Sequence, residues 1–132
     1  MVRQIKSGDE VLAVCVGGDW KEGLQFFSDD RDFIQVGTWR YPAGQRLKAH
    51  KHNRVERAIT HTQEAVYVRK GALKAIVYDQ AGRAVEEIVV REGDLLIMLR
   101  GGHGYEIIED DTQVLEVKNG PYPGPEADRT RL

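Results

Sequence analysis

Turn-forming residues recur along this chain at intervals of eight to twelve residues, and this spacing restricts the possible folds more than any other feature. Gly17-Gly18, Lys70-Gly71, Gly82 and Gly93-Asp94 each lie between short runs that are rich in β-branched and aromatic residues. Such runs are typical of β-strands, and no segment shows a convincing helical periodicity. The sequence therefore predicts an all-β fold of about ten short strands in an antiparallel sandwich or barrel.

The expected strands cover residues 11–16, 24–27, 33–41, 46–52, 64–68, 72–78, 83–91, 95–99, 103–108 and 113–118. Residues 53–62 are polar and irregular, which favours a surface loop. Residues 119–132 contain three of the four prolines, so we expect an extended tail that is ordered by packing.

The bulk properties favour a single domain, because 132 residues suffice for one hydrophobic core. The net charge is −2 with both signs interspersed, so no basic stripe points to nucleic acid. No apolar run reaches membrane-spanning length and no signal core is present, so we expect a cytoplasmic protein. Cys15 lies within the apolar run 11–16 and is interpreted as a buried hydrophobic residue.

Two histidines, His50 and His52, lie one residue apart in the expected strand 46–52. Side chains alternate between the two faces of a strand, so both imidazoles, together with Lys48, would project from one face at a spacing of about 7 Å. Such a pair binds a transition metal if neighbouring strands supply further ligands.

Glu64 begins another expected strand, in which its same-face neighbours Val66 and Val68 are apolar. A carboxylate buried there needs a cation or strong hydrogen bonds, which favours a ligand over a surface charge. His103 and Tyr105 share one strand face, so Tyr105 is a weaker candidate for an acid or base.

The order and spacing of several of these residues resemble the two motifs of the cupin superfamily, over roughly residues 33–118. The first motif is matched by Gly44, His50, His52, Glu64 and Gly71, and the second by Gly93-Asp94, Gly101 and His103. Eleven residues separate His52 from Glu64, where the family usually has three or four. Leu99 replaces the family's usual proline, and Ile107 stands where an asparagine is usual.

His103 also comes one residue earlier than the family's third histidine. A one-residue shift turns a strand side chain to the opposite face, and a bulge or tight bend at Gly101-Gly102 would compensate for it.

The resemblance implies a double-stranded β-helix (jelly-roll) barrel in one cupin domain, residues 1–132. Residues 33–118 would form the barrel core, residues 1–32 N-terminal strands and residues 119–132 the tail. It also implies a divalent transition metal (Fe, Mn, Ni, Cu or Zn) held by His50, His52, Glu64 and His103. If His103 missed the site, the other three would still form a facial triad.

Three functions are compatible with this resemblance. The first is a metal-dependent enzyme of oxygenase or isomerase type that acts on a small molecule. The alternatives are a metal-free sugar-nucleotide isomerase or epimerase, with a pocket histidine as base, and a non-enzymatic ligand-binding module. The GGHGYEII and EVKNGPY stretches are similar to single-domain cupins of unassigned function associated with bacterial polysaccharide synthesis, which suggests a nucleotide-sugar ligand.

Further polar and aromatic residues are weaker candidates for the pocket. His61 is more typical of a loop surface, and core packing is the commoner role of strand aromatics. The strand aromatics concerned are Trp39, Tyr41 and Tyr67. The charged residues of the loop, Arg54, Glu56 and Arg57, either form a lid over the pocket or, as the simpler interpretation, belong to a solvated loop. A homodimer is expected, because open sheet edges are best covered by a partner.

Overall fold

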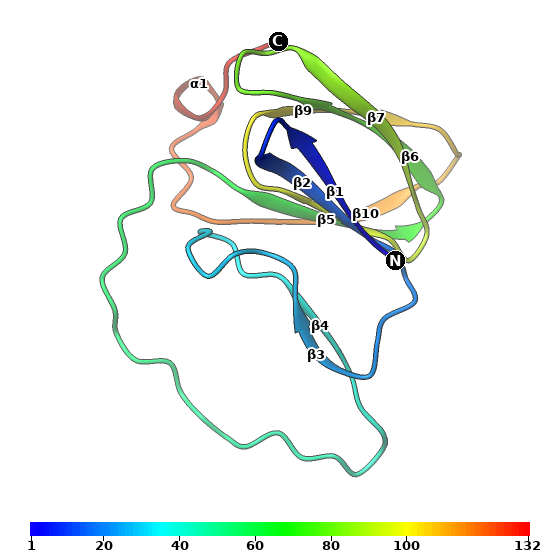
Figure 1. Ribbon diagram of the computed structural model, residues 1–132, viewed down its shortest axis with the longest axis vertical. Coiled ribbons are helices and arrows are strands. Elements are labelled where there is room, and N and C mark those ends of the chain that lie inside the picture. Colours follow the sequence, from blue (N-terminus) through cyan, green and yellow to red (C-terminus); the bar gives the residue numbers. More distant parts are fainter.

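The computed structural model describes all residues, 1–132, and contains ten strands and one short helix (Figure 1). The strands are β1 (Val2–Ser7), β2 (Glu10–Val16), β3 (Gly23–Phe26), β4 (Gly37–Arg40), β5 (Glu64–Lys70), β6 (Ala72–Tyr78), β7 (Ala84–Arg91), β8 (Leu95–Met98), β9 (Gly102–Ile107) and β10 (Gln113–Lys118). The helix, α1 (Pro125–Asp128), lies in the C-terminal tail.

The strands form three antiparallel sheets. The largest has the order β1-β2-β8-β5-β10, a second has the order β7-β6-β9, and β3 and β4 form a separate two-stranded ribbon. The prediction of an all-β, antiparallel fold is therefore confirmed.

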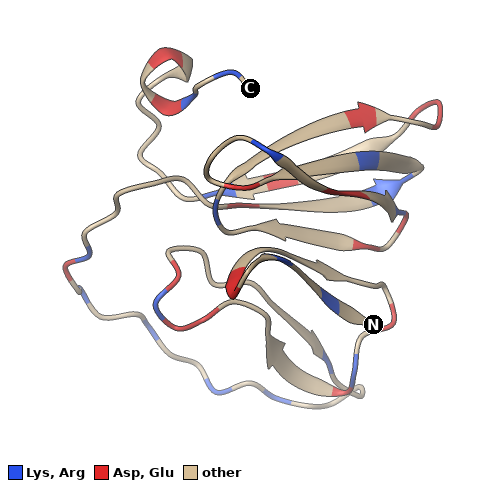
Figure 2. Ribbon diagram, turned by 45° about the horizontal axis from the view of Figure 1, so that its top comes forward, with Lys and Arg blue, Asp and Glu red and all other residues tan.

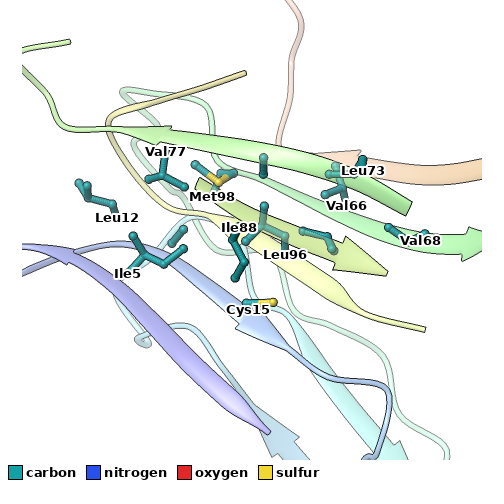
Figure 3. Close-up of a cluster of buried hydrophobic side chains, with 13 residues drawn as sticks. Ile5, Leu12, Cys15, Val66, Val68, Leu73, Val77, Ile88, Leu96 and Met98 are labelled. Atoms are coloured by element: carbon teal, nitrogen blue, oxygen red, sulfur yellow. The ribbon is translucent and has the colours of Figure 1, made fainter. Parts of the chain in front are cut away.

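The main hydrophobic core lies between the five-stranded and three-stranded sheets (Figure 3). Alternate residues of facing strands supply it, for example Val66 and Val68 from β5 and Leu73 and Val77 from β6. Leu96 of β8 is fully buried in the same cluster. Burial of these side chains is the main favourable contribution to folding, at roughly 25 cal/mol per Å² of apolar surface.

The opposite face of the five-stranded sheet is also covered. Residues such as Val14 and Ile97 pack there against Ile34 and the partly buried Trp20 and Phe27, which belong to the segment between β2 and β4. Because β2 and β8 are buried on both faces, their sequences are continuous apolar runs rather than alternating ones.

The two main sheets do not close into a barrel. The five-stranded sheet ends at β10 and the three-stranded sheet ends at β9, and no strand pairs with either outer edge. Of the two arrangements predicted from the turn spacing, a sandwich or a barrel, the structure shows facing sheets and no closed barrel. The narrower assignment to a cupin-type jelly roll stays a prediction.

The expected strand at residues 46–52 is absent. These residues have no regular secondary structure, and every residue from 42 to 62 is exposed. Only Leu47 and Ala49 are apolar in the 46–52 stretch, so it offers little hydrophobic burial in exchange for the conformational entropy of ordering a strand. The surface loop expected at residues 53–62 is confirmed and extends further than predicted.

We call residues 42–62 the strap. It leaves the body after β4, runs outside the sheets, and returns to β5 (Figure 1). Its returning end is fixed, because the Gln63 backbone N–H donates to Asn119 Oδ1 and the Asn119 amide donates to the His61 carbonyl. The strap is thus tethered directly beside Glu64.

Two other strand predictions differ from the structure. β1 was not expected, because its sequence VRQIKS is mostly polar and only Ile5 is buried. The expected strand 33–41 shortens to β4, because residues 29–35 instead form a tight loop. In that loop the Gln35 side chain donates to the carbonyls of Asp29 and Asp32.

The C-terminal tail, residues 119–132, packs along the body as expected but contains the unpredicted helix α1. Lys118 Nζ lies 5.0 Å from the centroid of the Tyr122 ring, and the Leu132 side chain fills the space beside Gly102. No helix in the structure has both the length and the apolar character needed to cross a membrane.

Candidate functional site

Glu64 occupies the first position of β5 and points into the space between the two main sheets. Its parity matches that of Val66 and Val68, which lie in the hydrophobic core. Only 7% of the residue is exposed. The sequence-based expectation of a buried carboxylate at this position is confirmed.

His103 and Tyr105 of β9 project from the same inner face of the three-stranded sheet. His103 pairs with Val77 and Tyr105 pairs with Ala75, and both of these β6 residues belong to the core. Gly101 precedes β9 with φ +78°, and a Cβ there would collide with the Tyr78 carbonyl oxygen. Only glycine permits so tight a bend. His103 therefore faces the interior, although it comes one residue earlier than the third histidine of the cupin motif.

Glu64, His103 and Tyr105 form a connected cluster. The distance from His103 Nε2 to Glu64 Oε1 is 2.9 Å, and the Tyr105 hydroxyl donates to the same oxygen at 2.9 Å. The rings of His103 and Tyr105 lie 5.0 Å apart between centroids. We call these three residues the Glu64 cluster.

The environment of the cluster perturbs two pKa values. Burial alone would raise the pKa of Glu64, but hydrogen bonds from His103 and Tyr105 and the charge of Lys118 outweigh it, so the net pKa lies below its ordinary value. Burial raises the pKa of the Tyr105 phenol strongly, and the neighbouring Glu64 carboxylate raises it further. Glu64 is therefore ionised and Tyr105 is neutral at physiological pH.

β10 supplies two charged residues that the sequence reasoning missed. Lys118 pairs in register with Glu64 and Glu116 pairs with Val66, so both lie on the inner face of the sheet. Lys118 Nζ is 3.4 Å from Glu116 Oε1. The alternation of residues 113–118 places Glu116 and Lys118 on one face of a strand. Which face of the sheet that is becomes known only when the partner strand, β5, is known.

Solvent reaches the members of the Glu64 cluster to different extents, and neither the outer edge of β9 nor that of β10 pairs with another strand. The His103 side chain is 32% exposed, whereas that of Glu64 is 10% exposed. A small molecule entering from solvent would therefore meet His103 before Glu64.

His50 and His52 do not reach the Glu64 cluster. Both lie on the exposed strap with their ring centroids 5.1 Å apart, and His50 Nδ1 contacts the nearby Lys48 carbonyl. No group of three or more His, Cys, Asp or Glu side chains lies close enough to hold a metal. Zinc-type sites need three or four protein ligands, so the residues as arranged do not fit the expected metal centre.

The structure also places the weaker candidates. Tyr67 lies on the opposite sheet face, 6.5 Å from Trp20 between ring centroids, so the suggestion that it lines the pocket mouth is wrong. Trp39 and Tyr41 form a pair with ring centroids 6.0 Å apart near the ribbon. His61 is exposed at the end of the strap, as expected, and packs on Phe33.

Cys15 is buried in the core, as the apolar run around it predicted. Burial raises the pKa of its thiol, which keeps it protonated and unreactive.

A cleft of about 840 Å³ lies away from the Glu64 cluster, beside the β1–β2 turn and residues 26–32. Its main charged groups pair with one another: Arg100 with Asp32 at 2.8 Å, and Arg31 with Asp29 at 2.8 Å. The cleft therefore presents few charges that would need a ligand.

Comparison of the chain with family models, curated proteins and solved structures gave no match. The resemblance to cupins accordingly rests on the motif residues alone.

Proposed function

We propose that this protein is an enzyme that moves a proton on a small molecule at the Glu64 cluster, as a metal-free isomerase or epimerase does. The observation that carries the proposal is the 2.9 Å contact between His103 Nε2 and the buried Glu64 carboxylate. A histidine held by a carboxylate at one ring nitrogen is a common arrangement of a general base.

The geometry suggests a role for each residue. When Nε2–H donates to Glu64, the tautomer leaves Nδ1 as the proton acceptor of the His103 ring. Nδ1 would take a proton from a carbon next to a carbonyl, and the imidazolium would return it from the same side to the neighbouring carbon, as in an isomerisation; inversion at the first carbon would need a second proton donor, such as solvent water, on the opposite face. Tyr105 is too weak an acid to supply that proton, so it is a positioning residue that holds the Glu64 carboxylate.

The expected substrate is a sugar nucleotide, as the motif resemblance suggests. The test is solvent deuterium incorporation into oxo-sugar nucleotides, followed by NMR. We expect His103→Ala to lower the exchange rate by about 10²- to 10⁴-fold, the usual contribution of a general base. The control is Glu92→Ala, because Glu92 is exposed and lies outside both the strap and the Glu64 cluster, so the rate should be unchanged. Ligand binding without any exchange would instead favour a non-enzymatic binding module.

A second candidate function is metal binding by His50, His52, Glu64 and His103. Two observations favour it: Glu64 and His103 are already in contact, and His50 and His52 are neighbours on a strap with few contacts. The strap would have to move for all four to meet. A metal bound there would polarise a carbonyl group or water.

Elemental analysis of untagged protein tests this second function after incubation with Fe, Mn, Ni, Cu or Zn. If this second function holds, the wild type will carry stoichiometric metal, His50→Ala and His52→Ala will lose it, and His61→Ala will retain it. A protein that takes up none of these metals would refute the metal-binding function and leave the acid–base function intact.

For assembly, we propose a homodimer built on two apolar faces. Leu24, Phe26 and Trp39 share the outer face of the β3–β4 ribbon and are each more than half exposed, as are Leu115 and Val117 on β10. A two-stranded ribbon is only marginally stable alone. A two-fold axis would place the ribbon of each copy on β10 of the other.

Sedimentation velocity tests this arrangement. We expect a dimer for the wild type at micromolar concentration, and a monomer for Trp39→Lys or Leu115→Lys. Val85→Lys on β7 is the control, because it adds the same charge at an exposed apolar position outside the two faces. A wild type that sediments as a monomer would contradict the proposal.

A further inference from the structure

The strap concentrates positive charge that is hidden in the overall composition. It contains the cations Arg46, Lys48, Lys51, Arg54 and Arg57 and the single carboxylate Glu56, which gives a net charge of +4. Because the whole chain carries −2, the remaining residues carry −6. Figure 2 shows the blue Lys and Arg positions spaced along this outer segment.

The cations of the strap are unpaired. None of the five takes part in an ion pair, whereas Arg3, Lys74 and Arg100 on the body each contact a carboxylate. All five are exposed. Their charge is therefore available to an external anion.

The strap is connected to the Glu64 cluster at its returning end. Gln63 is held at its backbone N–H by Asn119 and at its side chain by the Leu99 carbonyl, and Glu64 follows directly. Arg57 lies seven residues before Glu64, and an extended chain of that length spans at most about 24 Å. The chain therefore keeps Arg57 within about 24 Å of Glu64, which is the shortest such limit for any cation of the strap.

The composition of the strap favours a small anion over a macromolecule. Residues 42–62 contain no Phe, Tyr or Trp, so the strap lacks the aromatic rings on which nucleic acid bases stack. The strap has no helix and thus no amphipathic helical face for a membrane surface. Arg and Lys side chains bind phosphate groups through charge-assisted hydrogen bonds.

We propose that the strap binds the phosphate or pyrophosphate group of the ligand that the Glu64 cluster acts on. This inference rests on the proposed function for the location of the ligand. It adds that the strap, rather than the sheets, recognises the phosphate group of that ligand.

The test is calorimetric titration of the full chain with inorganic pyrophosphate. The strap variant replaces Arg46, Lys48, Lys51, Arg54 and Arg57 with Gln. The matched control replaces five exposed, unpaired cations of the body with Gln and so changes the net charge equally: Lys6, Lys21, Arg69, Arg91 and Arg131. We expect affinity to fall by at least about tenfold in the strap variant, the equivalent of one charge-assisted hydrogen bond, and to stay within about twofold in the control.

Three results would overturn the inference. They are equal affinity losses in the two variants, no measurable binding of pyrophosphate by the wild type, and tighter binding of single-stranded DNA or anionic vesicles than of pyrophosphate. A fourth result, from urea unfolding of the ligand-free strap variant, would also overturn it. A marked loss of stability would show that the strap cations stabilise the acidic body instead of binding phosphate.

The Glu64→Gln variant separates this inference from the proposed function. It should bind pyrophosphate as the wild type does, because Glu64 lies outside the strap. Deuterium exchange measured on the same variant reports on proton transfer, and so on the proposed function, independently of pyrophosphate binding.

Discussion

At the first residue of β5, a carboxylate is buried against apolar neighbours and is stabilised by its hydrogen-bond donors. Glu64 accepts from Tyr105, contacts His103 and pairs in register with Lys118. An ionised carboxylate in such a position is costly unless its partners are in place. The three strands β5, β9 and β10 are therefore coupled through one side chain.

Replacing this carboxylate should make stability less dependent on pH. The folded-state pKa of Glu64 is lowered, so its contribution is present above the unfolded-state pKa near 4.5 and is lost as the pH falls through the folded-state value. We expect Glu64→Gln to lower the free energy of unfolding by about 1–3 kcal/mol at pH 7, with the difference shrinking toward pH 3.

Urea unfolding monitored by tryptophan fluorescence at both pH values measures this difference. Glu92→Gln serves as the control, because Glu92 is exposed and forms no ion pair. A constant difference between the wild type and Glu64→Gln at all pH values would contradict the assigned role of the carboxylate.

At the scale of elements, the bend between β8 and β9 decides which way the candidate base points. The glycine at position 101 adopts φ +78° beside the Tyr78 carbonyl, and this geometry directs His103 into the space between the sheets. The outer edge of β9 carries no partner strand. The local bend and the core pairing with β6 thus position His103 without support from the strap.

We expect Gly101→Ala to lower the free energy of unfolding by about 2–4 kcal/mol, because the methyl group combines left-handed backbone strain with a collision against backbone. Gly8→Ala is the matched control. Gly8 also has a positive φ, +57°, but a Cβ there meets no atom within 4 Å, so about 1 kcal/mol of backbone strain alone is expected. Thermal or urea unfolding of both variants measures the difference, and equal losses would exclude a steric role for the Tyr78 carbonyl.

At the scale of the whole molecule, the strap divides the chain into two parts that fold together. Strands β1–β4 precede it and β5–β10 follow it, yet β2 of the first part pairs with β8 of the second over four residue pairs. The body should therefore survive a break in the strap.

Limited digestion with trypsin tests this division. We expect the first cuts after the strap cations, because proteases prefer exposed segments with few backbone hydrogen bonds. The two pieces should co-elute on a native sizing column and separate only in denaturant. Early cleavage at Lys70 or Lys74, which lie in strands, would show that the strap is protected.

The sequence by itself determined the fold class and much of the site. Alternation and turn spacing identified most strands, and the apolar neighbours of Glu64 showed that this carboxylate would be buried. Such patterns are reliable because they follow from local backbone geometry and from burial of one strand face.

Tertiary structure alone decided which strands pair and which side chains meet. β1 forms on the edge of the five-stranded sheet although its sequence is mostly polar. Residues 46–52 join no sheet, although His50 and His52 have the spacing of two residues on one strand face. Glu116 and Lys118 join the site only through the pairing of β10 with β5. Strand pairing and burial depend on partners distant in the chain, so a local pattern defines a face without determining what that face will contact.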